Sequence, residues 1–537
     1  MRKCLYAIAA LTLAAAIAGC GSGSSGSTNA ASHGGSGSSK HYAELRWGSL
    51  VWPGVLNTRT VGWSPTFMIE SLVVQHLVEF EPNGKLKLGL ASSIEHPNAT
   101  TYIYHIKPGV KFSDGQPLTT SDVVYSLDQN LEKIATTNAF WSPLVASVAA
   151  TGKSTVVIKL KKPDVDWPSI LAYSSQILEK AAAEKAGGLK ALGTPQHLPI
   201  GTGPWKFDTY TPDARVELSR NRYWTGPAQP ASKISFVLFK EEAAMSLALR
   251  SGAIDGAMDY ENQKLFAEIP GSRQLDSAPN WLDFLSVNVT KAPFNNVHVR
   301  RAIAYATNIN GMLKALFPAG DAVRPASIVP TPGFTEIGAS ETQIKSMLST
   351  VPQYEFDLAA AQRELAKSPY PHGFTTEIAA CVVEPLLVQA AQILATDLAK
   401  VGIKAKVNAF PTDAFPSMYG NKIKIFLNEG AVFFPEPDQV LTELLSPAFM
   451  TVAGANTSSY SNAEVTKLLP AELEIANPAS RLQLVGRILK RAGAELPYLP
   501  MFSHANFATL SNKYVEPTWS LYSSFYTPWA LNVKLAS

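Results

Sequence analysis

The chain has 537 residues, three cysteines and a formal net charge of +3. Hydrophobic residues make up 46% of the sequence and charged residues 17%, a composition that excludes a disordered scaffold. The weak positive charge gives no reason to expect a nucleic-acid partner, and three cysteines are too few for a fold held together by disulfides. The length corresponds to roughly three or four domains' worth of chain.

The first 20 residues have the pattern of an export signal. Arg2 and Lys3 precede an apolar run from Cys4 to Ala18, which is too short to span a bilayer. The run ends in Ile17-Ala18-Gly19-Cys20, which resembles the bacterial lipobox, in which the cysteine is lipidated and becomes the first residue of the mature protein. We therefore predict a lipid anchor at Cys20. The alternative is an ordinary secretory signal with an incidental cysteine.

The segment after this signal is predicted to be a tether. Residues 21–39 contain no large apolar side chain and are rich in Gly and Ser, so we assign 21–41 to a flexible linker. Signal cleavage would remove Cys4 and lipidation would occupy Cys20, which leaves Cys381 alone and no intramolecular disulfide. We expect an exported protein, anchored by lipid to the outer face of the cell membrane or located in the periplasm.

From about residue 42 the sequence alternates between extended and helical patterns. Residues 101–112 alternate in polarity and predict a strand, followed by a turn at Ser113-Asp114-Gly115. Thr119 and Asp122 have capping-box spacing and predict the start of a helix. Residues 155–160 predict a second strand.

A β-α-β unit is predicted farther along the chain. Residues 374–382 and 403–409 have strand-like composition, and Gly402 marks the end of the helix between them. One face of that helix carries Leu387, Ala391, Leu394 and Leu398. The fold class is therefore mixed α/β.

The sequence offers no recognisable catalytic constellation. No serine has the glycine spacing of a nucleophile elbow, and Gly152-Lys153-Ser154 precedes a strand rather than the helix that a phosphate loop needs. His96 and His105 are interpreted as surface or core residues, and the acidic pair Glu472 and Glu474 as part of a solvated face. We expect no enzymatic activity, no resident metal and no cofactor.

Five segments together resemble the large solute-binding proteins of ABC importers, the family 5 group that contains the dipeptide- and oligopeptide-binding proteins. They lie in the order in which that family has them. The segments are 107–125 (KPGVKFSDGQPLTTSDVVY), 199–205 (PIGTGPW), 250–255 (RSGAID), 288–307 (NVTKAPFNNVHVRRAIAYAT) and 435–438 (PEPD).

The resemblance implies a periplasmic-binding-protein-like (type II) clam shell of two lobes with an extra inserted domain. Lobe I would comprise 42–79, 200–289 and 503–537, the inserted domain 80–199, and lobe II 290–502. A solute would bind between the lobes, and the closed protein would deliver it to an ABC permease and its ATPase. The family default is a monomer.

The ligand prediction depends on one departure from the family. In members that take peptides, an Asp three residues before the Asp/Glu-Pro turn pairs with the peptide's α-ammonium group. Here Glu436-Pro437 places Phe433 at that position. Because a cation buried without a partner is costly, either Glu429 or Asp259 replaces the missing Asp, or the ligand has no free α-amino group.

The full set of candidate ligand-binding residues combines these positions with aromatic residues at cleft-lining positions. They are Trp52, Trp141, Met258, Asp259, Tyr260, Trp281, Glu429, Phe433 and Phe434. The predicted function is capture of a peptide or peptide-like solute for import. The alternatives are the same role for an oligosaccharide, an opine-like compound or a metal chelate, and a signalling receptor or enzyme on the same fold.

Overall fold

The computed structural model describes residues 41–537 except 52–53, 62–63, 261, 278, 319, 335–336, 383, 412–422, 451–454 and 506. Residues Lys40–Ser537 form one compact unit, separate from Met1–Ser39. The predicted signal, the lipidation site at Cys20 and most of the tether lie outside the described residues, as does Trp52. These predictions remain predictions.

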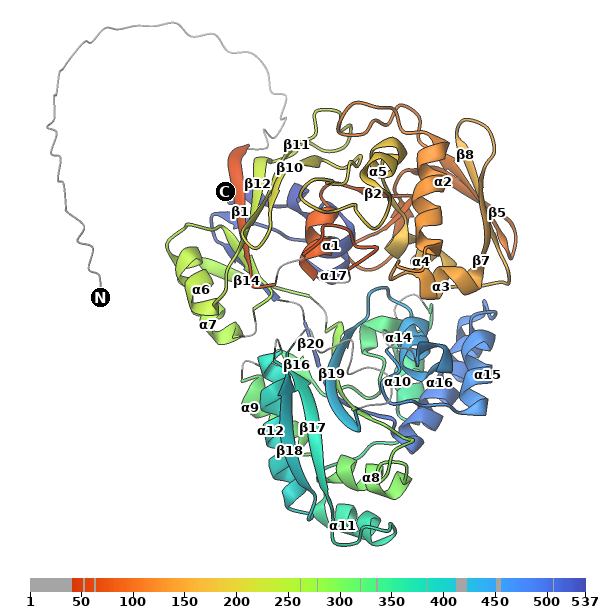
Figure 1. The fold of residues 1–537 in the computed structure, drawn as a ribbon, viewed down its shortest axis with the longest axis vertical. Helices are drawn as coiled ribbons and strands as arrows, with labels where there is room; N and C mark the ends of the chain where they lie inside the picture. The colour runs from red at the N-terminus through yellow and green to blue at the C-terminus, as the bar shows by residue number, and fades with distance from the viewer. Residues whose placement is uncertain are drawn as a thin grey trace, which may run out of the picture. The chain divides into compact units, whose positions relative to one another are not determined.

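The first of the two large sheets has seven strands and draws on both ends of the compact unit (Figure 1). Parallel pairing of β1 with β12 and β13 lies at its centre, and the hairpin of β10 and β11 extends one side. In spatial order the strands are β10 (Trp205–Thr211), β11 (Arg215–Arg220), β12 (Ala231–Leu238), β1 (Tyr42–Ser49), β13 (Gly256–Met258), β21 (Phe507–Ser511) and β14 (Ser272–Asp276).

The second large sheet has six strands and contains the predicted β-α-β unit. Its order is β16 (Ala322–Val323), β20 (Tyr498–His504), β15 (Trp281–Val287), β19 (Ile425–Ala431), β17 (Thr375–Cys381) and β18 (Lys404–Phe410). Strands β17 and β18 are parallel and are joined by α12 (Pro385–Ala399), which confirms the prediction. Gly402 has a φ of +86°, a conformation that glycine tolerates better than other residues, so the chain can turn from α12 into β18.

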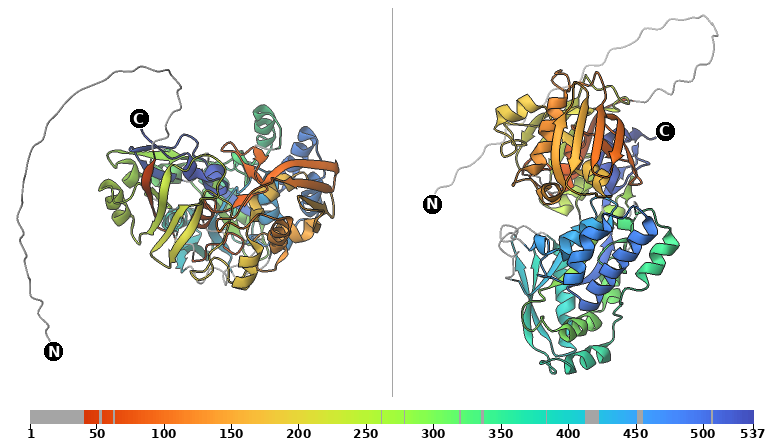
Figure 2. Two further views of the ribbon diagram at one scale, coloured as in Figure 1. Left: turned by 90° about the horizontal axis from the view of Figure 1, so that it is seen from above. Right: turned by 90° about the vertical axis from the view of Figure 1, so that its right-hand side faces the viewer.

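A separate four-stranded antiparallel sheet is formed by residues 91–160, the orange strands in the right-hand view of Figure 2. Its order is β5 (Ala91–Asn98), β6 (Thr101–Ile106), β8 (Thr155–Leu160) and β7 (Val145–Ala150). The predicted strand over 101–112 ends early, at Ile106, because Pro108 and Gly109 turn the chain. The predicted capping box of Thr119 and Asp122 is confirmed at the start of α2 (Thr120–Asp128).

Helices pack on both faces of the six-stranded sheet. They are α8 (Val297–Ala306), α9 (Ile309–Leu316), α10 (Glu341–Leu348), α11 (Leu358–Ala366), α12, α14 (Pro437–Leu445), α15 (Ala463–Glu472) and α16 (Pro478–Glu495). Alternate residues of β15 point to opposite faces, so Leu285 packs with α8, α9 and α12, while Phe284 packs on the side of α10 and α14–α16. Elsewhere in the described part of the chain lie α1 (Ser64–Glu70), α3 (Asn138–Leu144), α4 (Trp167–Ser174), α5 (Lys180–Ala186), α6 (Glu242–Arg250), α7 (Gln263–Ala267) and α17 (Leu521–Tyr526). Within the described part of the chain, none of the helices has the length and apolar character needed to cross a membrane.

Three two-stranded ladders complete the fold. They are β2 (Gln75–His76) with β9 (Gln176–Ile177), β3 (Val78–Phe80) with β4 (Leu86–Leu88), and β22 (Tyr514–Val515) with β23 (Lys534–Leu535).

The two large sheets are joined by two short connections. Residues 277–280 link β14 of the first sheet to β15 of the second, and residues 505–506 link β20 of the second back to β21 of the first. Strand β15 therefore belongs to the six-stranded sheet, although the predicted lobe I extended to residue 289. The division into lobes stays a prediction.

Candidate functional site

Phe433, a predicted ligand-binding residue, lies in an aromatic cluster. Its ring stacks on Phe67 of α1 at a centroid distance of 6.1 Å and lies 6.0 Å from Tyr173 of α4. Phe434 is buried and lies 5.8 Å from the same tyrosine. The cluster brings the segment after β19 against α1 and α4. Its rings offer an apolar surface and no fixed charge.

Trp141, another predicted ligand-binding residue, has the environment of a core residue. It is fully buried, its indole nitrogen donates to the Ser174 hydroxyl at 2.8 Å, and its ring meets Trp167 edge-on. Its contacts within the fold thus satisfy both its ring and its polar atom. Its role in ligand binding stays a prediction.

In the segment Met258-Asp259-Tyr260, the first and last side chains lie in the core, and the side chain of Asp259 lies next to two serines. Met258 and Tyr260 are buried, and the Tyr260 hydroxyl lies 2.6 Å from that of Thr509. The half-buried Asp259 accepts hydrogen bonds from Ser49 at 2.7 Å and from Ser64 at 2.5 Å. Burial raises the pKa of Asp259, and the two serine hydroxyls oppose that rise. The carboxylate is therefore held by neutral donors.

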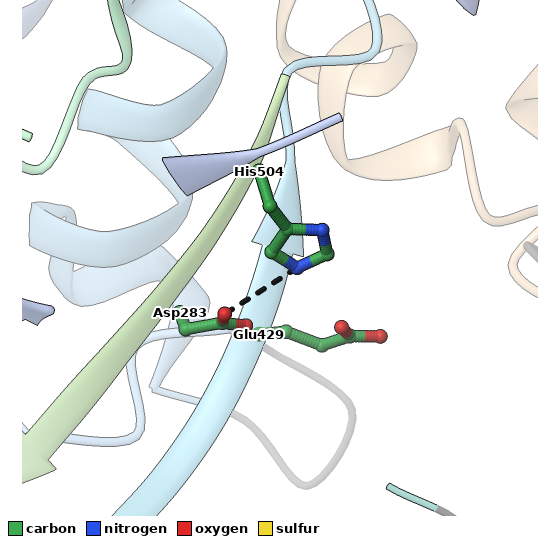
Figure 3. Close-up of side chains that lie close together, drawn as sticks. All are labelled: Asp283, Glu429 and His504. Atoms are coloured by element: carbon green, nitrogen blue, oxygen red, sulfur yellow. Dashed lines mark ion pairs between the residues drawn. The ribbon is translucent and has the colours of Figure 1, made fainter. Parts of the chain in front are cut away.

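Glu429, the other candidate anion, belongs to a group of three ionisable side chains on adjacent strands of the second sheet (Figure 3). Asp283 of β15 lies directly opposite Glu429 of β19, and His504 of β20 lies opposite Trp281. Trp281 and Asp283 share one face of β15, because residues two apart on a strand point the same way. The Trp281 ring is nearly parallel to the His504 ring, with centroids 6.4 Å apart.

Electrostatic interactions within this group are strong because Asp283 is fully buried. His504 Nε2 lies 3.3 Å from Asp283 Oδ2, the contact marked by the dashed line in Figure 3. Burial works to lower the pKa of His504, but Asp283 and Glu429 raise it to about 9. Burial and the charge of Asp283 raise the pKa of Glu429 to about 7.

A second buried ionic group surrounds Arg481 of α16. Its guanidinium lies 2.6 Å from Asp166 at the start of α4, 2.9 Å from Glu436 at the start of α14, and 2.6 Å from Glu472 at the end of α15. All four side chains are buried. The interpretation of Glu472 as part of a solvated face was therefore wrong: Arg481 supplies the partner that offsets the desolvation of its carboxylate.

More carboxyl groups adjoin this ionic group than Arg481 can neutralise. Burial, together with the charge of Asp166, raises the pKa of Asp438 to about 7 and that of Asp164 to about 8. Burial also raises the pKa of Glu436 and of Glu472 well above the usual range. Some of these carboxyls therefore hold a proton near neutral pH.

The structure thus brings some predicted residues together and separates others. Trp281 and Glu429 lie around His504, and Phe433 and Phe434 share the aromatic cluster, whereas Asp259 directly follows β13 of the other large sheet. Sequence reasoning missed Asp283, His504, Asp166 and Arg481. One signal was available, because Asp283 interrupts the otherwise apolar start of a strand, where a carboxylate is unusual.

Two mixed sheets are joined by two short connections, and ionisable and aromatic side chains lie at the ends of the joining strands. The family comparison identifies the class as solute-binding protein. The model described as "Bacterial extracellular solute-binding proteins, family 5 Middle" matches residues 85–451, and the chain belongs to this family.

Relatives and solved structures extend the similarity over most of the chain. The chain is 24% identical to Heme-binding protein A of Haemophilus influenzae over 516 residues, covering 87% of this chain and 90% of the relative. It is 26% identical to the glutathione-binding protein GsiB of Escherichia coli K12 over 441 residues, covering 80% and 82%. The structure of the binding protein DppA from Helicobacter pylori with the peptide STSA matches with a TM-score of 0.80 at 21% identity, covering 92% and 98% of the two chains, and supports the fold.

Proposed function

We propose that the protein captures a peptide or peptide-like solute outside the cytoplasm and delivers it to an ABC-type importer. The observation that carries this proposal is the pair of short connections, 277–280 and 505–506, that join the two large sheets. Two adjacent connections can act as a hinge, about which the two parts close on a solute. The similarity to a glutathione-binding protein and to a structure with a bound peptide supports a peptide or peptide-like solute.

In this proposal the lobes are the segments named above, with 80–199 as the inserted domain. The contacts of Phe433 with Phe67, and of Arg481 with Asp166, link residues that belong to different segments and favour the closed arrangement. A solute drives closure only by as much as it binds the closed form better than the open one. The protein therefore needs no catalytic step, and we propose no enzymatic activity and no cofactor.

Recognition of the solute combines aromatic surface with one anion. Phe433, Phe434 and Trp281 provide flat apolar faces that suit side chains or a peptide backbone. The α-ammonium group, if the solute has one, pairs with Glu429 or Asp259 rather than with position 433. Of these two carboxylates, that of Asp259 already accepts hydrogen bonds from two serine hydroxyls.

A thermal-shift measurement on the purified protein tests this function. Di- to pentapeptides, their N-acetylated forms, oligosaccharides, opines and nickel chelates are compared at saturating concentration. A ligand that binds only the folded form at 100 times its Kd adds about 2.7 kcal/mol and raises Tm by a few degrees. Stabilisation by free peptides alone supports a carboxylate that binds the α-ammonium group. Stabilisation by blocked peptides alone supports a peptide-like solute without that group, and stabilisation by sugars alone contradicts the peptide assignment.

The remaining parts of the proposal concern location and partners. The lipobox-like segment would anchor the protein through Cys20 at the outer face of the membrane, and the linker would let the folded part reach the permease. The partners are the permease and ATPase of the importer, and the protein acts as a monomer. Co-purification of a permease encoded beside this chain, stronger with the bound solute than without it, is the corresponding test.

A further inference from the structure

We propose that Asp283, Glu429 and His504 form a binding site for one divalent transition-metal ion, with Zn²⁺ as the ion that fits best. This proposal goes beyond the proposed function, and it also departs from the expectation of no resident metal. The three residues come from the three central strands β15, β19 and β20 and converge on one face of the sheet (Figure 3).

The distances suit a small ion. One ligand atom from each side chain lies within 4.8 Å of the other two, and His504 Nε2 lies 3.3 Å from Asp283 Oδ2. Zinc bonds of about 2.1 Å in a tetrahedral arrangement place neighbouring ligand atoms about 3.4 Å apart. The Asp283–His504 pair already has this spacing, and a rotation of the longer Glu429 side chain brings its carboxylate into place.

An independent observation is one unpaired oxygen of Asp283. The side chain is 0% exposed, and its Oδ2 atom forms the ion pair with His504 Nε2. Among the described residues no group donates a hydrogen bond to its Oδ1 atom. Buried polar atoms are nearly always paired, so an unpaired oxygen of a fully buried carboxylate, next to a histidine and a second carboxylate, indicates a ligand.

The charges point in the same direction. Asp283 and Glu429 lie directly opposite each other on paired strands, and Asp283 is fully buried, so the two carboxylates need a cation between them. A divalent ion bound by two carboxylates and a neutral imidazole gives a net charge of zero, the favourable state for a site of low dielectric. Binding forms one M–N and two M–O bonds, without oxidation or reduction.

The ligand set favours zinc over the hard cations. Imidazole nitrogen suits Zn²⁺, Co²⁺ and Ni²⁺, whereas Mg²⁺ and Ca²⁺ prefer sites made of oxygen ligands alone. Three protein ligands leave a fourth position open. His504 and Glu429 are only partly buried, so an ion or its fourth ligand can reach the site from solvent.

Binding of Zn²⁺ to the full-length chain, stripped of metal with a chelator, is measured by calorimetry, and Co²⁺ is added in parallel for its visible spectrum. We expect one equivalent of Zn²⁺, and Co²⁺ absorption bands typical of tetrahedral nitrogen and oxygen ligation. His504→Gln and Glu429→Gln should each weaken Zn²⁺ binding at least tenfold. Two variants are used because replacement of His504 next to a buried Asp283 could impair folding, whereas Glu429 is half-buried and its replacement is milder.

The matched control is His105→Gln. His105 also pairs with a carboxylate, Glu95, at 2.7 Å, but on the exposed face of the four-stranded sheet and with one acid instead of two. Its Zn²⁺ isotherm should equal that of the unchanged chain. Equal isotherms for all variants, or no binding of Zn²⁺ and Co²⁺ by the unchanged chain, would overturn the proposal. So would a free peptide that stabilises the chain through Glu429 while Zn²⁺ does not bind, because the group would then hold an ammonium ion. Peptide stabilisation of the metal-free chain tests the proposed function separately.

Discussion

Arg481 of α16 and Asp166 at the start of α4 form a buried ion pair, with 2.6 Å between guanidinium nitrogen and carboxylate oxygen. The pair joins a helix packed on the second large sheet to one that precedes the ladder strand β9. The backbone reinforces this contact, because the amide of Val165 donates to the carbonyl of Leu473 at 2.9 Å. Removal of either charge therefore weakens the contact between α16 and the start of α4, in addition to any effect on each helix alone.

Replacement of Arg481 by Met should be strongly destabilising. It leaves Asp166, Glu436 and Glu472 buried without their cation, and loss of one partner of a buried ion pair costs about 3–5 kcal/mol. Urea unfolding measures the change. Arg487→Met is the control, since the pair of Arg487 with Glu464 is exposed and should contribute less than about 1 kcal/mol. Equal effects of the two substitutions would show that the Arg481 group contributes no more than a surface pair.

The same ionic group should make stability depend on pH. In the folded protein the pKa of Asp438 is raised to about 7 and that of Asp164 to about 8, so the folded state binds protons that the unfolded state releases. Stability from such groups is present at low pH and is lost as pH rises through these values. We expect the free energy of unfolding to be lower at pH 8.5 than at pH 6.5, by at least about 1 kcal/mol.

Asp438→Asn and Asp164→Asn separate this effect from other titrations. Each substitution keeps the shape of the side chain and removes its titration, so each should flatten the pH dependence between 6.5 and 8.5. An unchanged slope in both variants would assign the dependence to other residues. The window stays above pH 6.5 because burial lowers the pKa of His76 to about 3, and that group destabilises the fold as pH falls below the usual histidine range.

Phe433→Asp should change both stability and ligand preference. The substitution removes the stacking contacts with Phe67 and Tyr173 and places a carboxylate among aromatic rings, at a cost of about 2–4 kcal/mol without ligand. It should also favour ligands with a free ammonium group over their N-acetylated forms. The ratio of the two Kd values is the measurement, and Phe433→Leu controls for loss of the ring. A ratio that stays constant would mean that position 433 does not face the solute.

Gly402→Ala should lower the stability of the protein more than Gly271→Ala does. Both glycines have positive φ, +86° and +75°. A Cβ at Gly402 would meet the carbonyl oxygen of His372 at 2.5 Å, whereas a Cβ at Gly271 meets nothing within 4 Å. Gly271→Ala should cost about 1 kcal/mol from the backbone conformation alone, and Gly402→Ala clearly more. Thermal unfolding of the two variants checks the order, which an equal loss would contradict.

Cys20→Ser should abolish lipid anchoring. Only a cysteine at this place in the lipobox-like sequence supplies the thiol for the lipid, so the variant should lose incorporation of labelled fatty acid and leave the membrane fraction. Cys381→Ser is the control, because that buried cysteine lies in β17 and should not affect anchoring. Retention of the label in Cys20→Ser would favour an ordinary secretory signal.

Local features of the fold were predictable because their causes are local. The spacing of Leu387, Ala391, Leu394 and Leu398 predicts α12, and the pair Thr119 and Asp122 predicts the start of α2. The strand predicted over 101–112 was too long, since alternation continues past Pro108, where the backbone turns.

Contacts between distant segments were not predictable in the same way. Asp283, Glu429 and His504 meet only because β15 pairs with both β19 and β20, and nothing in a single sequence gives that pairing. The prediction for Glu472 was wrong for the same reason, because its partner Arg481 lies on the next helix. A charged residue is predicted to be exposed unless its counter-ion is known.

The position of β21 between β13 and β14 has a consequence for how the protein is made. Strands β13 and β14 come from the middle of the chain, and the strand that fills the gap between them ends at Ser511, close to the C-terminus. Translation must therefore pass Ser511 before the first large sheet can be completed, and until then β13 and β14 have no strand between them.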